Sequence, residues 1–165
     1  MVDRDKAIAG IRLVAFVVDG VFTDGRFYLS NDGVETKAFS TQDGYGIRRL
    51  LEAGIEVAVI SGRSSAAVDG RMRELGVNHV IQGCKDKVAA FRELTATLGI
   101  ARKDCVFVGD DVPDLPLLHA VGFSVAVANA VSEVRESCDY TTSAVGGYGA
   151  VREVCDLVLA ARSVN

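Results

Sequence analysis

The sequence of 165 residues contains four cysteines, and no two of them have the C-x-x-C spacing. This absence argues against a zinc site and against a dithiol redox motif. We therefore predict that all four cysteines are reduced and mostly buried. Cys105 is expected in a strand and Cys155 on the apolar stripe of a helix. The other two are Cys84 and Cys138.

Long hydrophobic runs and clusters of basic residues are also missing. No stretch is long enough to cross a bilayer, and the N-terminal segment MVDRDKAIAG has acidic residues but no apolar core, unlike a signal peptide. A net charge of −4 and a pI near 5.2 argue against a nucleic-acid-binding surface, and the scattered basic residues argue against a membrane-binding patch. We expect a cytoplasmic protein that binds neither nucleic acid nor membrane.

The sequence has no internal repeat, linker or low-complexity segment. With 49% hydrophobic and 24% charged residues, its composition is ordinary for a globular protein. We predict one domain over residues 1–165, with residues 1–10 as an N-terminal extension.

Short apolar runs alternate with amphipathic segments along the chain, which predicts an α/β fold with a mostly parallel sheet and helices on both faces. The predicted extended segments are 13–18, 56–60, 77–81, 105–108, 123–126 and 139–141. The predicted helices are 45–53, 64–75, 85–98, 114–120, 131–138 and 150–161.

Residues 25–39 interrupt this alternation. An Asn31-Asp32-Gly33 turn between two apolar segments predicts a β-hairpin. The hairpin could be a decorative insertion, but Phe27, Tyr28 and Phe39 make it too apolar to stand free in solvent.

Polar groups follow several of the predicted strands. Asp19-Gly20 alone would be explained by a turn after a buried strand. Its combination with a hydroxyl, lysines and an acidic cluster at later strand and loop ends indicates a site for magnesium and phosphate. These later groups are Ser61-Gly62-Arg63, Lys85, Lys87, Asp110-Asp111 and Asp114.

The segment VVDGVFTDG at residues 17–25 resembles the first motif of the haloacid dehalogenase (HAD) superfamily, D-x-D-G-V-x-x-D-G. From about Ile11 to Ala161, the chain resembles the branch typified by 3-deoxy-D-manno-octulosonate 8-phosphate (KDO-8-phosphate) phosphatase. The resemblance implies a three-layer Rossmann-like fold without a large cap domain. It also implies that residues 25–39 form a flap that packs against neighbouring subunits and helps to wall the site.

The resemblance further assigns roles in magnesium-dependent phosphoryl transfer. Asp19 corresponds to the acid/base residue, whose backbone carbonyl also binds the metal. Asp110 corresponds to the distal metal ligand, supported by Asp111 and Asp114. Ser61, Gly62 and Lys87 correspond to the phosphate-binding residues, because phosphate needs donors and a positive charge around its oxygens.

A small phosphorylated sugar acid is the substrate that the resemblance implies. Arg63 and Arg71 correspond to residues that hold its carboxylate, which suits the bidentate arginine side chain. Arg71 fits an exposed helix position equally well. The resemblance also places a loop against the substrate, although the sequence alone favours helix capping by Thr41 or Asp43. This loop consists of Ser40, Thr41, Gln42, Asp43 and Gly44.

The glycine-rich segment at residues 146–150 also resembles this phosphatase branch. In that branch four subunits assemble and the C-terminal segment approaches a neighbouring site, which implies a homotetramer here. A flexible loop that caps the last helix would explain the same glycines. Closure by a neighbour would shield a cap-less site from water.

Val17 occupies the position of the family's nucleophilic aspartate. Valine can neither attack phosphorus nor bind magnesium, so the phospho-aspartyl intermediate cannot form there. Asp19 faces the same way as Val17 but lies one pleat repeat further along, which makes it a poor substitute. We expect severely impaired or absent hydrolysis and weaker metal binding.

Three alternatives remain open. The chain is either an altered copy of a working phosphatase, which the intact motif residues favour, or a non-catalytic relative used for binding or assembly. The substrate is either KDO-8-phosphate or a nine-carbon sialic-type phosphate. A flavodoxin-like receiver domain would also gather acidic residues and a lysine, but the hairpin and the late Gly-Asp-Asp argue against it.

Overall fold

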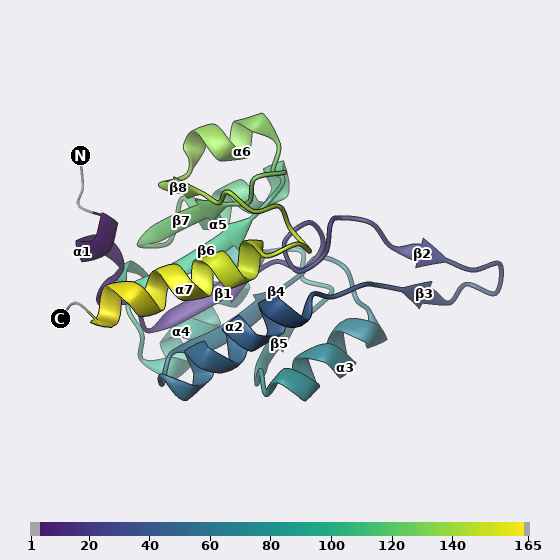
Figure 1. The fold of residues 1–165 in the computed structure, drawn as a ribbon, viewed down its shortest axis with the longest axis horizontal. Coiled ribbons are helices and arrows are strands. Elements are labelled where there is room, and N and C mark those ends of the chain that lie inside the picture. Colours follow the sequence, from purple (N-terminus) through teal and green to yellow (C-terminus); the bar gives the residue numbers. More distant parts are fainter. Residues whose placement is uncertain (1–3, 164–165) are drawn as a thin grey trace.

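The computed structural model describes residues 4–163 and contains a parallel six-stranded sheet in the order β5-β4-β1-β6-β7-β8 (Figure 1). Each pairing in this sheet is parallel, which confirms the predicted α/β fold. The strands are β1 (Leu13–Phe16), β4 (Glu56–Ile60), β5 (His79–Ile81), β6 (Cys105–Gly109), β7 (Phe123–Ala126) and β8 (Tyr140–Thr141).

Helices cover the sheet on both sides. In Figure 1, α2 and α7 lie side by side in front of the sheet, and α4 lies behind it. The α-helices are α1 (Arg4–Ile8), α2 (Thr41–Glu52), α3 (Ala66–Leu75), α4 (Lys87–Leu98), α5 (Leu115–Leu118), α6 (Ser132–Ser137) and α7 (Ala150–Ser163). Two short 3₁₀ helices are η1 (Arg102–Asp104) and η2 (Val112–Asp114).

The central strand β1 fixes where the site forms. All four of its residues are completely buried, as the apolar run predicts for a strand covered on both faces. Phe16 pairs with Val59 of β4 on one side and with Val108 of β6 on the other. The residues that follow these three strands therefore emerge together at one edge of the sheet, where ligands bind in open α/β folds.

Several predicted boundaries shift in the structure. The first strand ends at Phe16 rather than Val18, because the Val18 carbonyl accepts hydrogen bonds from the following turn. Helix α2 begins four residues earlier than predicted, at Thr41. The prediction that Thr41 or Asp43 caps this helix is wrong: Ser40 is the N-cap, and its Oγ accepts a hydrogen bond from the Asp43 N–H at 3.3 Å.

The predicted hairpin is confirmed and projects from the body of the molecule (Figure 1). Its strands are β2 (Tyr28–Leu29) and β3 (Glu35–Thr36). Tyr28 and Leu29 are 63% and 64% exposed, whereas Phe39 packs against the core. Phe39 therefore anchors the hairpin to the core, while Tyr28 and Leu29 remain largely exposed.

The four cysteines are free, and two of them are buried. Cys105 lies in β6 and Cys155 in α7, as predicted, while Cys84 and Cys138 are only half-buried. Burial raises the pKa of Cys105 to about 12, so this thiol remains protonated at neutral pH.

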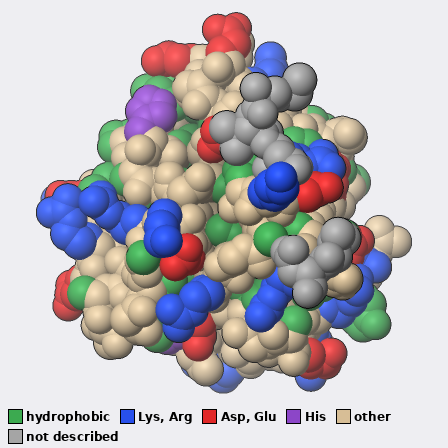
Figure 2. Space-filling model, turned by 90° about the vertical axis from the view of Figure 1, so that its left-hand side faces the viewer, with side chains coloured by type: hydrophobic (Ala, Val, Ile, Leu, Met, Phe, Trp, Pro, Cys, Tyr) green, Lys and Arg blue, Asp and Glu red, His purple; other side chains and the backbone are tan. Residues whose placement is uncertain are grey.

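On the face drawn in Figure 2, acidic and basic side chains are interspersed. Within residues 4–163, none of the helices has the length and apolar character needed to cross a membrane.

Asp43 joins α2 to α7 through a buried carboxylate. The residue is 1% exposed, and its Oδ1 accepts a hydrogen bond from the Arg152 N–H at 3.0 Å. Its Oδ2 has no hydrogen-bond partner among the described residues. Burial raises the pKa of Asp43, against the opposing effect of the Arg152 and Gly149 backbone N–H groups. The charged form is therefore disfavoured in the folded state.

We predict that Asp43→Asn raises the melting temperature at pH 7. Because the folded-state pKa is raised, the stability of the unmodified chain falls as pH increases above the ordinary value of 3.8. The gain in melting temperature from Asp43→Asn should shrink as pH is lowered toward that value. Thermal unfolding of both proteins between pH 7 and this value measures the gain, with the exposed Asp32→Asn as control. A gain of the same size at both ends of the pH range, or no gain at pH 7, would contradict the prediction.

Candidate active site

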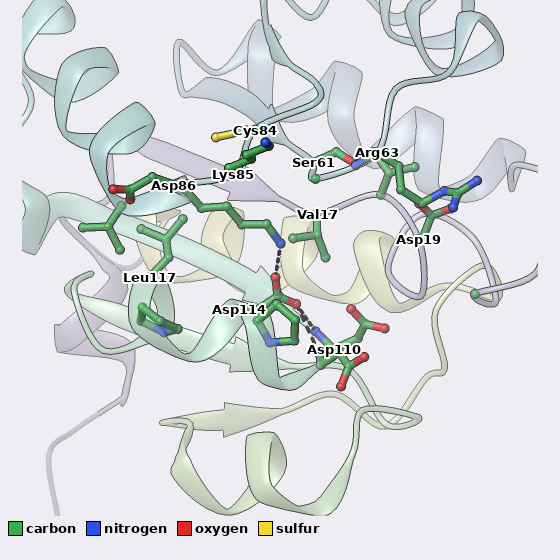
Figure 3. A pocket seen from close by; sticks show the side chains of 18 residues that line it. Val17, Asp19, Ser61, Arg63, Cys84, Lys85, Asp86, Asp110, Asp114 and Leu117 are labelled. Carbon is green, nitrogen blue, oxygen red and sulfur yellow. Dashed lines mark hydrogen bonds and ion pairs between the residues drawn. The ribbon is translucent and has the colours of Figure 1, made fainter.

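A cleft of about 650 Å³ opens at the carboxyl edge of the sheet. Its walls come from the ends of β1, β4 and β6 and from the start of α4 (Figure 3). The predicted site residues that line it are Val17, Asp19, Ser61, Gly62, Arg63, Lys87, Asp110, Asp111 and Asp114. Residues from distant parts of the sequence thus meet in one cavity.

Asp114 holds the acidic side of the cleft in place. Its Oδ2 accepts hydrogen bonds from the N–H groups of Asp110 at 3.0 Å and Asp111 at 3.2 Å. Its Oδ1 lies 2.5 Å from Nζ of Lys87, the first residue of α4. Although Asp114 lines the cleft, its side chain is only 3% exposed, and its carboxylate is occupied by the neighbours that it orients.

The other wall of the cleft carries groups that suit a phosphate. Ser61 follows β4 and is 5% exposed, and its Oγ accepts a hydrogen bond from the Arg63 N–H at 3.3 Å. Lys87 also lines the cleft, where its Nζ forms the ion pair with Asp114. A hydroxyl and an ammonium group in one cleft can both contact the oxygens of one phosphate.

Asp110 is the cleft residue whose pKa is most clearly shifted from its ordinary value. Burial, followed by the nearby Asp114 and Asp111 carboxylates, raises the pKa of Asp110 to about 7, with Lys87 acting in the opposite direction. A Cβ on Gly20 would come within 1.9 Å of the Asp110 Oδ2, so this carboxylate packs directly against the backbone of the first motif. A cation there would relieve both the burial and the repulsion.

The oxygen ligands in this cleft are of the type that binds magnesium, but there are fewer of them than in the family pattern because Val17 replaces a carboxylate. The Asp110 carboxylate and the Asp19 backbone carbonyl are the hard oxygen ligands that Mg²⁺ prefers. Within the described part of the chain, no group of three or more His, Cys, Asp or Glu side chains is arranged to hold a metal. Val17, 4% exposed at the head of the cleft, supplies an isopropyl group in place of a carboxylate.

The sequence reasoning missed Lys37, which comes from the hairpin. Its side chain is only 1% exposed, and its Nζ forms ion pairs with Asp19 and with Glu35, the latter at 3.0 Å. The only sequence signal was a lysine near the end of the second hairpin arm. Nothing in the local pattern indicates that this lysine turns inward to contact Asp19.

Arg63 lies at the mouth of the cleft and also contacts the hairpin. Its Nη2 is 3.3 Å from the Glu35 Oε2, and its Nε is 4.0 Å from the Asp19 Oδ2. Its guanidinium carbon lies 4.4 Å from the centre of the Phe27 ring. Together with Lys37, these contacts place two cations and two carboxylates in one network between the hairpin and the cleft.

The remaining predicted substrate residues lie outside the cleft lining. Residues 40–44 begin α2, and Arg71 of α3 forms an ion pair with Glu74 at 2.9 Å. A Cβ on Gly44 would approach the Arg71 Nη2 to 2.3 Å, so these two groups lie against each other. Their contact with a substrate remains a prediction.

The glycine-rich segment braces the first motif within the same chain. The Gly147 N–H donates to the Val21 carbonyl at 3.1 Å, and the Gly146 N–H donates to the Asn129 Oδ1 at 2.7 Å. A Cβ on Gly146 would lie 1.8 Å from the Gly20 carbonyl oxygen. The close approach of two backbones explains why glycine is needed here.

We predict that Lys37→Met lowers the melting temperature by several degrees. The substitution removes the buried cation and leaves the Asp19 and Glu35 carboxylates facing each other. Adding Glu35→Gln should recover part of the loss, because it removes one of these two charges. Thermal unfolding measures both effects, with exposed Arg26→Met of the same hairpin as control. An unchanged melting temperature for Lys37→Met would contradict the role of this ion pair.

Comparison with known proteins agrees with this geometry. A profile of the haloacid dehalogenase-like hydrolase family matches residues 80–152. The chain is 49% identical over 152 residues to 3-deoxy-D-manno-octulosonate 8-phosphate phosphatase from Escherichia coli, an alignment that covers 92% of this chain and 81% of that protein.

Solved structures show the same relationship. The phosphatase from Moraxella catarrhalis, crystallised with magnesium, phosphate and KDO, superposes with a TM-score of 0.96 at 45% identity and covers 99% of this chain and 94% of that one. The cobalt-bound enzyme from Haemophilus influenzae gives a TM-score of 0.92 at 38% identity, covering 95% and 92%. The fold, the converging strand ends and the relatives agree: the chain belongs to the haloacid dehalogenase-like hydrolases, in the KDO-8-phosphate phosphatase branch.

Proposed function

We propose that this chain is a magnesium-dependent sugar-acid phosphate phosphatase whose hydrolytic step is severely impaired by Val17. KDO-8-phosphate, a lipopolysaccharide precursor, is the proposed substrate. The observation that carries the proposal is the position of Val17. It stands at the head of a cleft in which Ser61, Lys87 and Asp110 all converge.

The residues present account for substrate binding. Ser61 and the backbone of Gly62 would donate hydrogen bonds to the phosphate, and Lys87 would offset its negative charge. Bound Mg²⁺, held by Asp110 and the Asp19 carbonyl, would supply further charge neutralisation. Asp19, fixed by Lys37, is the proposed acid/base residue.

The residue missing from this set is the nucleophile. Val17 carries no oxygen to attack phosphorus, and Asp19 is engaged by Lys37 rather than directed at the position that Val17 occupies. The phosphate ester can therefore be held at this site without an in-line group to displace it. The intact binding groups favour an altered copy of a working phosphatase over a chain kept for binding alone.

We also propose that the protein is cytoplasmic and assembles as a homotetramer through the hairpin. The exposed tip of the hairpin supports this assembly, because Tyr28, Leu29 and Val34 are each more than 60% exposed. Tyr148, within the glycine-rich segment, is 72% exposed and adds an aromatic surface. Apolar side chains that gather on a projecting element are typical of subunit contacts.

We predict that Val17→Asp restores phosphate release from KDO-8-phosphate in the presence of magnesium, with a gain of at least about 10³-fold in kcat. The new carboxylate supplies both the nucleophile and a metal ligand. A colorimetric phosphate assay of both proteins measures the gain, and Val17→Asn, which has the shape of aspartate without its charge, serves as a control that should remain inactive. A panel that includes nine-carbon sialic-type phosphates identifies the preferred sugar acid.

Two results of this assay would contradict the proposal. Brisk turnover by the unmodified chain would show that Val17 does not limit hydrolysis. No gain in the Val17→Asp protein would favour a non-catalytic binding or assembly module instead.

We predict that the unmodified chain binds Mg²⁺ at least about tenfold more weakly than the Val17→Asp protein, because one anionic oxygen ligand is absent. Adding Asp110→Asn to Val17→Asp should reverse the gain, whereas Asp32→Asn should not. Isothermal titration calorimetry with MgCl₂ measures these affinities. Equal affinities of the unmodified chain and the Val17→Asp protein would contradict the assigned metal position.

A further inference from the structure

The ring of Phe27 supports the guanidinium of Arg63 at the mouth of the cleft. The Arg63 side chain is 52% exposed, yet its guanidinium carbon lies only 4.4 Å from the ring centre. A long, exposed arginine normally loses rotamer freedom when it binds a ligand. Contact with a ring on the hairpin restricts that freedom before any ligand arrives.

Contact with the ring leaves hydrogen-bond donors of this arginine available. The guanidinium carbon lies over the Phe27 ring, and a cation–π contact of this kind does not require an N–H donor. Glu35 engages Nη2 at 3.3 Å, and Asp19 lies 4.0 Å from Nε. Within residues 4–163, the guanidinium of Arg63 donates a hydrogen bond from Nη2 to Glu35 and none from Nη1. Contact with Phe27 thus positions Arg63 while Nη1 remains able to donate to an anion.

The charges around Arg63 cancel one another, so binding of an anion depends on how the N–H groups of Arg63 are directed. Lys37 lies 3.0 Å from Glu35 and pairs with Asp19, so the two cations of this network are balanced by two carboxylates. The network therefore has no net positive charge that would attract anions non-specifically. Recognition of a second anionic group must come from the directed N–H groups of Arg63.

We propose that Phe27 is a positioning and specificity residue, which holds Arg63 so that its edge binds the carboxylate of a phosphorylated sugar acid. This inference rests on the proposed function, in which the phosphate of the same ligand lies at Ser61 and Lys87. Phe27 contributes no group to the reaction itself and acts mainly through Arg63, whose guanidinium carbon lies 4.4 Å from its ring centre, compared with 5.6 Å for Nζ of Lys37. Its effect is on the choice between phosphate esters with and without a carboxylate.

Binding to the unmodified chain tests this proposal, because Val17 prevents turnover of the ligand. Isothermal titration with magnesium would compare KDO-8-phosphate with glucose 6-phosphate, which has no carboxylate. Phe27→Leu should weaken KDO-8-phosphate binding about two- to fivefold, the size of one exposed cation–π contact. Its affinity for glucose 6-phosphate should not change.

Two further variants separate positioning from a general effect on the hairpin. Phe27→Tyr keeps the ring and should keep the affinity, whereas Arg26→Met changes the neighbouring, exposed residue of the hairpin and should have no effect. In an Arg63→Ala background, Phe27→Leu should have no additional effect on KDO-8-phosphate, because the two residues act as one unit. Thermal unfolding of each variant confirms that the fold is retained.

The outcomes distinguish this inference from the proposed function. Equal losses for both ligands, no loss for KDO-8-phosphate, or additive effects with Arg63→Ala would each overturn the role of Phe27 while leaving the proposed function intact. Failure of the unmodified chain to bind either ester would overturn the proposed function, and the role of Phe27 with it.

Discussion

The parallel pairing of β1 with β4 and β6 is the constraint on which the site depends. This register ends all three strands at the same level, so Val17, Ser61 and Asp110 enter one cleft although they are far apart in the sequence. A shift of β1 would break its parallel ladders with β4 and β6 and force four completely buried side chains to repack. The site is therefore as well fixed as the centre of the sheet, and a change at residue 17 alters its chemistry without altering its frame.

Because the strand ends meet at one edge of the sheet, several carboxylates lie close together there. Only some of their negative charges are neutralised by lysine side chains. Lys87 is paired with Asp114, and Lys37 with Asp19, which leaves Asp110 as the buried carboxylate with a strongly raised pKa. A divalent cation is the natural partner for such a group. A carboxylate at position 17 would increase the need for that cation, so nucleophile and metal depend on each other.

Local patterns were sufficient to predict the strands, the order of the elements and the groups at the strand ends. Apolar runs such as residues 13–16 indicate burial, and Asp110 follows its strand directly in the sequence. Contacts between distant side chains have no comparable signal. The inward turn of Lys37 toward Asp19, and the reach of Asp43 to the first turn of α7, depend on packing that periodicity does not encode. The N-cap of α2 was misplaced because Ser40, Thr41 and Asp43 all favour that position.

The hairpin carries two sets of side chains with different environments. Phe27, Glu35 and Lys37 contact charged groups of the cleft, and these contacts need only this chain. Tyr28 and Leu29, which pair with Thr36 and Glu35, are each more than 60% exposed. In the proposed assembly a second surface would cover these two apolar side chains. Because Leu29 and Glu35 are partners in one antiparallel ladder, such a contact would also restrain the residues that orient Arg63.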